Sequence, residues 1–187
     1  MNISVIGTGY VGLVTGSCFA KLGNKVICVD VDREKIKKIN NGKSPIYEEG
    51  LDELLSKYKK NIIATNDYEL AIKNTDITFI CVGTPSRKNG TIDISYVKNV
   101  AMKIAKLLKK KKQWHLVVIK STVLPGTTQE IVLPLLEEYS GKKVGREIGL
   151  AMNPEFLKEG VAIEDFLKPD RIVIGTYDKK SRDKLRE

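Results

Sequence analysis

The chain begins with the run Ile3-Ser4-Val5-Ile6-Gly7-Thr8-Gly9-Tyr10-Val11-Gly12, a short apolar segment that changes into the spacing G-x-G-x-x-G. Each glycine suits a separate purpose. Gly7 allows a turn off a strand, Gly9 leaves room for a close-lying pyrophosphate, and Gly12 lets a helix approach the strand. Phosphate oxygens would bind the N–H groups at the helix N-terminus, where the dipole favours negative charge. With a strand before it and a helix after it, this motif predicts a dinucleotide site.

The helix and second strand that a dinucleotide site requires follow directly in the sequence. Apolar residues keep helical spacing up to Gly23, and a second apolar run, Lys25–Val29, ends in Asp30. Asp30 lies 18 residues after Gly12, close to the spacing of about 20 at which an acid reaches the adenosine ribose hydroxyls. A carboxylate there accepts from the 2′-OH and repels a 2′-phosphate, so the predicted cofactor is NAD and not NADP. The alternative is that Asp30 only caps a helix that starts near Asp32.

Composition favours one domain that spans residues 1–187, with 42% apolar residues for its core. The formal charge is +9, but the lysines are scattered and no nucleic-acid-reading motif accompanies them, so we expect no nucleic-acid partner. The sharpest basic cluster, Lys109–Lys112, follows a predicted helix, where cations complement the dipole and stay solvated.

The three cysteines, Cys18, Cys28 and Cys81, fall in apolar patterns without metal-ligand spacing. They are interpreted as buried core residues in a reducing compartment, and no metal is predicted. The single histidine, His115, precedes an apolar strand and is expected to be structural. The first apolar run is too short for a signal peptide or membrane span, so we expect a cytoplasmic protein without membrane attachment.

Strand and helix patterns alternate along the rest of the chain. The fold class predicted is therefore α/β, a Rossmann-type doubly wound parallel sheet in three layers with helices on both faces. Besides the first strand, the first helix and the strand 25–29, we expect strands at 61–65, 76–82, 116–119, 148–152 and 171–175, and helices at 33–41, 51–55, 68–73, 94–108, 129–139, 160–166 and 179–187.

Ligands of such a sheet bind outside the carboxyl ends of its strands. The loops expected at this edge are 7–12, the position of Asp30, 82–86, 121–125 and 153–158. Glu155 and Glu159 are four positions apart, so on a helix they would share one face. Spacing does not decide between a carboxylate pair for acid–base chemistry and a solvated surface pair.

Taken together, these loops resemble the N-terminal NAD-binding domain of the nucleotide-sugar 6-dehydrogenases, the UDP-glucose/GDP-mannose dehydrogenase family. The resemblance covers nearly the whole chain. The motifs that support it are Gly7–Gly12, Ser44–Leu51, Val82–Pro85, Lys120–Val123, Asn153–Gly160 and Pro169–Arg171. It implies oxidation of a sugar C6 alcohol to a carboxylate with two NAD, through an aldehyde and a cysteine-bound thiohemiacetal and thioester, in nucleotide-sugar metabolism and polysaccharide biosynthesis.

Site residues follow from the resemblance, motif by motif. The residues that resemble the NAD site are Gly7, Gly9, Tyr10, Val11, Gly12, Asp30, Lys35, Val82, Gly83, Thr84, Ser121 and Glu159. Thr122 resembles the hydroxyl that lies with a water near C6, Glu155 resembles the general acid–base, and Glu159 resembles the glutamate that approaches the cofactor. The catalytic residues implied are thus Thr122, Glu155 and Glu159, and those along the substrate are Glu155, Phe156, Leu157 and Lys158.

One part of the family pattern has no match in this sequence. The family's nucleophilic cysteine lies in a second half, beyond a long central helix that makes most of the dimer, and none of the three cysteines here has a matching glycine- and proline-flanked motif. We therefore expect an NAD-binding domain that does not complete the oxidation by itself. The full-length family member is expected to be a homodimer, and this polypeptide a monomer or weakly associating.

The resemblance leaves the nucleotide sugar open. Lys120–Thr122 with Pro169–Arg171 favour UDP-glucose, oxidised to UDP-glucuronate, and GDP-mannose is the alternative within the family. A different class of function, a non-catalytic NAD-binding regulatory module, also fits the glycine loop and Asp30.

Overall fold

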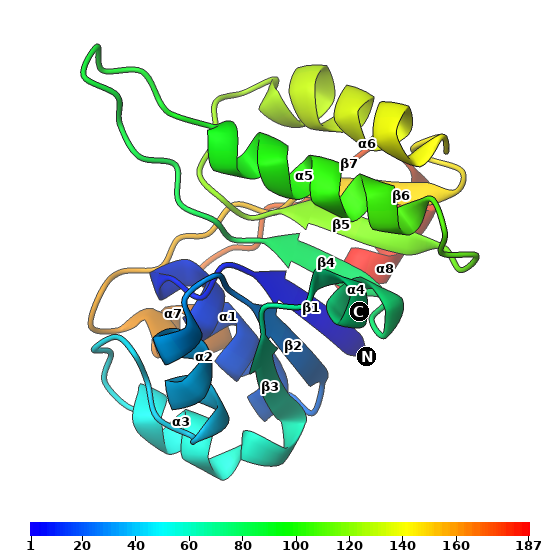
Figure 1. The fold of residues 1–187 in the computed structure, drawn as a ribbon. Coiled ribbons are helices and arrows are strands. Elements are labelled where there is room, and N and C mark those ends of the chain that lie inside the picture. Colours follow the sequence, from blue (N-terminus) through cyan, green and yellow to red (C-terminus); the bar gives the residue numbers. More distant parts are fainter.

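Seven strands form one sheet in the computed structural model, which describes residues 1–187 (Figure 1). They lie in the order β3-β2-β1-β4-β5-β6-β7, and neighbours are parallel except for β6 and β7. The first six follow the Rossmann order, which places the ligand crevice where the order reverses, beside β1 and β4. The strands are β1 Asn2–Ile6, β2 Lys25–Val29, β3 Ile62–Thr65, β4 Ile77–Ile80, β5 His115–Ile119, β6 Ile148–Met152 and β7 Gly175–Thr176.

Helices cover both faces of this sheet, so the predicted three-layer doubly wound fold is confirmed. Helices α1, α2, α3, α7 and α8 pack on one face, and α4, α5 and α6 on the other (Figure 1). None of them combines the length and apolar character that crossing a bilayer requires. Their bounds are α1 Tyr10–Lys21, α2 Arg33–Asn40, α3 Leu51–Lys57, α4 Tyr68–Lys73, α5 Ser95–Leu108, α6 Leu133–Ser140, α7 Ala162–Leu167 and α8 Lys179–Arg186, with a 3-10 turn η1 Lys59–Asn61 and a π-helix η2 Thr127–Val132.

The strands are apolar almost throughout because both of their faces are buried. In β1, Ile3 and Val5 pack under α1, while Ile6 belongs to the core below α5. Burial on both faces explains why these strands read as continuous apolar runs and not as alternating ones. Apart from 129–139 and 171–175, the predicted elements are confirmed to within two residues at their ends.

The prediction for the last strand is wrong. Residues 171–174 pair with no strand, and β7 is only Gly175–Thr176, antiparallel to β6. A parallel strand would need a crossover that returns the chain to the amino edge of the sheet. Instead, the Asn153 amide donates to the Val173 carbonyl at 2.9 Å, which holds the returning chain at the carboxyl end of β6, so it enters β7 in the opposite direction.

The predicted helix 129–139 begins earlier and in another geometry. A π-helix, η2, precedes α6, and Pro134 lies in the first turn of α6. Proline has no N–H to donate four residues back, so the regular α-helical bonding is interrupted there. Gly126, with φ of +87°, starts this segment directly after the loop that follows β5.

One lysine of the basic cluster is partly buried, and not fully solvated as predicted. Lys111 turns inward, and its Nζ donates to the Ile72 carbonyl at 2.7 Å and to His115 Nδ1 at 2.9 Å. The other ring nitrogen of the fully buried His115 lies 2.7 Å from the Thr78 hydroxyl. Burial, and then the charge of Lys111, lower the pKa of His115 to about 3. His115 is therefore a neutral structural residue, as the sequence predicted.

Acid should weaken the fold through His115. The unfolded imidazole, with an ordinary pKa of about 6.5, binds a proton that the folded imidazole does not. Between pH 7 and pH 5 the free energy of unfolding should therefore fall by about 2 kcal/mol from this residue. Urea denaturation of the wild type and of His115→Gln at both pH values measures this share, because the other titrating groups cancel. Equal pH dependence in the two proteins would contradict the assignment.

Candidate cofactor and substrate site

The glycine loop packs so closely that two of its glycines admit no side chain. Gly7 has φ of +96°, and a Cβ there would lie 2.8 Å from the Cys81 carbonyl oxygen. A Cβ on Gly12 would lie 1.9 Å from the Gly7 carbonyl oxygen. Gly9 differs, because no protein atom lies within 4 Å of its Cβ position. The protein itself thus leaves open space at Gly9, which caps α1 without any side-chain bond and leaves the first N–H groups of the helix available.

Asp30 lies directly beside this loop. Its carboxylate accepts the Thr8 N–H at 2.7 Å, the Thr8 hydroxyl, and the Asp32 N–H at 3.0 Å. Burial by itself would raise the pKa of Asp30, but these hydrogen bonds and the charge of Lys35 outweigh burial and hold that pKa below its usual range. Asp32, not Asp30, caps α2 by accepting the N–H groups of its first turn. The alternative interpretation of Asp30 as a helix cap is therefore wrong.

The loops after β4 and β5 are tied to one another. The Ser121 hydroxyl donates to the Val82 carbonyl at 2.7 Å, and the Thr84 hydroxyl donates to the Thr122 carbonyl at 2.8 Å. Because Ser121 donates its one hydroxyl hydrogen to Val82, its oxygen can act only as an acceptor for a ligand. Ser121 is buried, whereas Thr122 is exposed. Because Gly7 packs against Cys81 and Val82, these two loops form a wall next to the glycine loop.

Glu155 and Glu159 do not share a helical face, so the condition for a carboxylate pair on one helix is not met. Residues 153–158 form no helix, and α7 begins only at Ala162. Pro154 disfavours helical geometry at the residue before it, and Gly160 has φ of +90°, which ends the segment in a left-handed turn. The Glu155 carboxylate instead accepts the Leu157 N–H at 2.6 Å. No hydrogen bond or ion pair joins the three predicted catalytic residues to one another.

The predicted substrate residues do not all lie in the same place. Glu155, Phe156 and Leu157 line a cavity of about 750 Å³ between the sheet, α7 and α8. Phe156 is 46% exposed, and the Arg171 guanidinium lies 4.9 Å from its ring centroid. Lys158 does not line the cavity; its ammonium lies 3.6 Å from the Asp165 carboxylate on α7.

Two residues that the sequence reasoning did not nominate lie in the same cavity. Lys120 is buried, and its ammonium donates to the Asn153 side-chain oxygen at 3.1 Å. Burial lowers the pKa of Lys120, and the nearby Cys81 and Glu155 oppose that shift. The position of Lys120 at the carboxyl end of a buried strand was the available signal, since polar residues there face the ligand edge.

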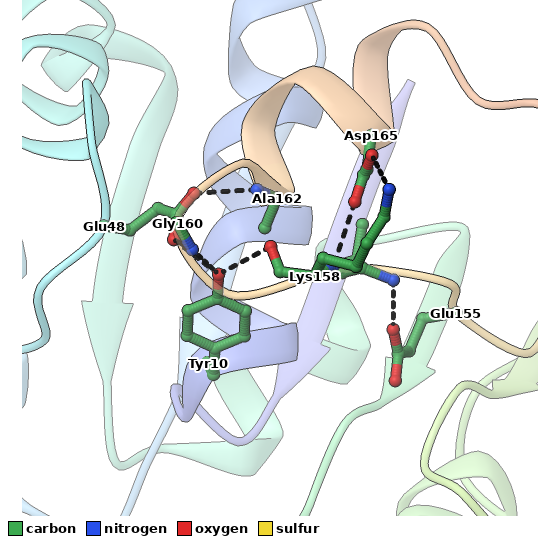
Figure 2. A network of polar contacts seen from close by, with 8 residues as sticks. Tyr10, Glu48, Glu155, Lys158, Gly160, Ala162 and Asp165 are labelled. Carbon is green, nitrogen blue, oxygen red and sulfur yellow. Dashed lines mark hydrogen bonds and ion pairs between the residues drawn. The ribbon is translucent and has the colours of Figure 1, made fainter.

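A third missed residue, Glu48, joins three separate segments (Figure 2). Its carboxylate accepts the Tyr10 hydroxyl and the N–H groups of Gly160 and Ala162, both at 2.8 Å. Burial would raise the pKa of Glu48, but these bonds hold it below its usual range. Burial and the bond to Glu48 raise the pKa of Tyr10. Glu48 lies in the motif Ser44–Leu51, but no pattern distinguishes Glu48, which turns inward, from its exposed neighbour Glu49.

The structure thus brings the five predicted loops to one edge of the sheet. Asp30 bonds the glycine loop, the loops after β4 and β5 bond each other, Lys120 bonds Asn153, and Tyr10 reaches Gly160. A doubly wound sheet with this loop and an acid after β2 is the architecture of an NAD-binding Rossmann domain. The open space at Gly9 and the free helix N-terminus fit a pyrophosphate, and Asp30 fits a ribose.

Comparison with known proteins also indicates an NAD-binding domain. The model of the UDP-glucose/GDP-mannose dehydrogenase family, NAD binding domain, matches residues 1–187. A GDP-mannose 6-dehydrogenase of Pseudomonas syringae pv. syringae is 48% identical over 187 residues, covering 99% of this chain and 43% of the relative. A UDP-glucose 6-dehydrogenase of Haloferax volcanii is 45% identical over 188 residues, covering 100% and 44%.

A solved structure shows the same likeness in three dimensions. The ternary complex of GDP-mannose dehydrogenase from Pseudomonas aeruginosa superposes with a TM-score of 0.98 at 46% identity, covering all of this chain and 43% of that one. The chain belongs to the UDP-glucose/GDP-mannose dehydrogenase family, as its NAD-binding domain. It spans less than half the length of these relatives.

The glycines give a matched pair of variants. Gly9→Val should still fold and lose measurable NAD affinity, because a Cβ at this position meets no protein atom within 4 Å whereas the side chain fills the space for the pyrophosphate. Gly12→Ala should lower stability by about 1–3 kcal/mol or more through the overlap with the Gly7 carbonyl. Thermal melts and calorimetric NAD titration of both variants measure these effects. Unchanged NAD affinity in Gly9→Val would refute the proposed cofactor position.

Proposed function

We propose that this chain is the cofactor-binding part of a nucleotide-sugar 6-dehydrogenase that acts in the cytoplasm. The observation that supports this most strongly is the conjunction of the open glycine loop with Asp30, next to a loop that contains Glu155 and Glu159. NAD supplies the hydride acceptor when it is bound. A module that only binds NAD would not need a loop with two carboxylates beside the cofactor loops.

Each nominated residue has a proposed role. Glu155 is the general acid–base, because oxidation at C6 requires removal of the hydroxyl proton. The exposed Thr122 hydroxyl orients the reacting group, and Glu159 lies near the cofactor, since its charge reaches Tyr10 of the glycine loop. Phe156 and Leu157 provide an apolar wall for the substrate, and Lys158 lies beside it. The NAD site comprises Gly7, Gly9, Tyr10, Val11, Gly12, Asp30, Lys35, Val82, Gly83, Thr84 and Ser121.

Two nucleotide sugars, UDP-glucose and GDP-mannose, are the candidate substrates. The sequence motifs favour UDP-glucose, and a UDP-glucose 6-dehydrogenase is among the relatives at 45% identity. The comparisons favour GDP-mannose, with a relative at 48% identity and a solved structure at a TM-score of 0.98. Calorimetric titration of the NAD-saturated protein with each nucleotide sugar compares them, and the tighter ligand identifies the substrate. Equal absence of binding would leave only the NAD-binding function.

The preference for NAD over NADP tests whether Asp30 lies at the adenosine ribose. Wild type should bind NAD more tightly than NADP, because the Asp30 carboxylate repels a 2′-phosphate. Asp30→Asn keeps an oxygen that can accept from the Thr8 N–H but removes the charge. The ratio of NAD to NADP affinity should therefore fall by about tenfold, the equivalent of about 1.4 kcal/mol of lost repulsion. A ratio that does not change would show that Asp30 is not at the ribose.

This polypeptide should not complete the oxidation by itself. Cys18, Cys28 and Cys81 are buried, and burial raises the pKa of each thiol to about 12, so none of them is an available thiolate nucleophile. With either nucleotide sugar and NAD, the purified protein should give no steady formation of the sugar acid. Sustained turnover to the sugar acid, measured by absorbance and by product analysis, would contradict the need for an external cysteine.

A further inference from the structure

Glu48 is a buried acid that the proposed chemistry does not use. It lies in the loop between α2 and α3 and is only 5% exposed. No cation pairs with it, because all of its partners are neutral donors: one hydroxyl and backbone N–H groups. An unpaired buried carboxylate is costly unless every oxygen is hydrogen-bonded. These donors are therefore what keeps Glu48 ionised in the interior (Figure 2).

The donors to Glu48 come from the start of α1, next to the glycine loop, and from the segment that leads into α7. Tyr10 is the residue directly after Gly9, and its backbone N–H lies in the first turn of α1. Gly160 and Ala162 follow Glu159 and lead into α7. The Tyr10 hydroxyl also accepts the Gly160 N–H at 3.1 Å and lies 3.3 Å from the Lys158 carbonyl oxygen. Glu48 and Tyr10 together hydrogen-bond the C-terminal end of the loop that contains Glu155 and Glu159.

The rest of that loop makes few hydrogen bonds to other segments. Between Asn153 and α7, the other hydrogen bonds stay within the loop or go to α7 itself, as from the Lys158 N–H to Asp165. Hydrogen bonds from residues 154–161 to segments earlier than β6 run only to Tyr10 and Glu48. Apart from the packing of Leu157 and α7 against the core, the position of Glu159 relative to the glycine loop therefore depends on these polar contacts.

We infer that Glu48 is a positioning residue, which, through the Tyr10 hydroxyl, couples occupancy of the glycine loop to the placement of the Glu155–Glu159 loop. This rests on the proposed NAD site. A dinucleotide on the first turn of α1 orders Tyr10, Tyr10 orients the Glu48 carboxylate, and that carboxylate holds the N–H groups of Gly160 and Ala162. The acid–base loop is thus assembled most firmly when the cofactor is present.

Amide hydrogen exchange of the 187-residue protein, followed by NMR with and without NAD, tests both the anchoring of the loop by Glu48 and its coupling to the cofactor through Tyr10. Glu48→Gln should speed exchange at Gly160 and Ala162 by at least about tenfold, because a hydrogen bond to a charged group is lost. In wild type, saturating NAD should slow exchange at these two amides. Tyr10→Phe removes only the side-chain hydroxyl, so it should lose the NAD-dependent slowing when exchange is measured at an NAD concentration that saturates this variant.

Glu49→Gln is the matched control. It removes the same charge one residue further along, from an exposed side chain, and should leave both amides as in wild type. If Glu48→Gln does not fold, Glu48→Asp retains the charge with a shorter reach and should show the same local acceleration. Unchanged exchange in the Glu48 variant would overturn the anchoring role. NAD-dependent slowing that persists in Tyr10→Phe would overturn the coupling, whereas wild type that binds no NAD would overturn the proposed function as well.

Discussion

The close approach of α1 to the sheet is the constraint on which the rest of this structure depends. The helix begins next to the Gly7 carbonyl oxygen only because Gly12 has no Cβ, which would lie 1.9 Å from that oxygen. This contact directs the N-terminus of α1 toward the carboxyl edge of β1 and β4, where the strand order reverses. The same approach places the Tyr10 side chain within reach of Glu48 and Gly160. The site for the pyrophosphate and the support for the acid–base loop thus have one structural origin.

Features determined by neighbouring residues were predictable from the sequence. The glycine loop, Asp30 and the buried strands each follow from short-range spacing, and the structure places them as expected. Features that depend on contacts between distant parts of the chain were not predictable from the sequence. The loop 153–160 has the glutamate spacing of a helix, yet it is not helical, and the Glu155 carboxylate accepts the Leu157 N–H instead. Sequence likewise gives no means to tell that Lys111, among four consecutive lysines, turns inward to His115.

Glu48 shows this limit most clearly. Glu48 and Glu49 are adjacent, chemically identical and in the same irregular loop, but only Glu48 meets donors from segments 38 and 112 residues away in the chain. Those donors are present because α1 and α7 pack together on one face of the sheet. A residue whose role is to connect two ligand loops therefore becomes visible only when the fold has placed both loops.

The most direct test of this account is a crystal structure of the protein with NAD. We predict that the pyrophosphate lies on the N–H groups of Tyr10 and Val11 and passes over Gly9. The adenosine ribose hydroxyls should lie within hydrogen-bond distance of Asp30, and the nicotinamide should point toward Ser121 and Glu159. A dinucleotide bound elsewhere, or a ribose directed away from Asp30, would contradict it.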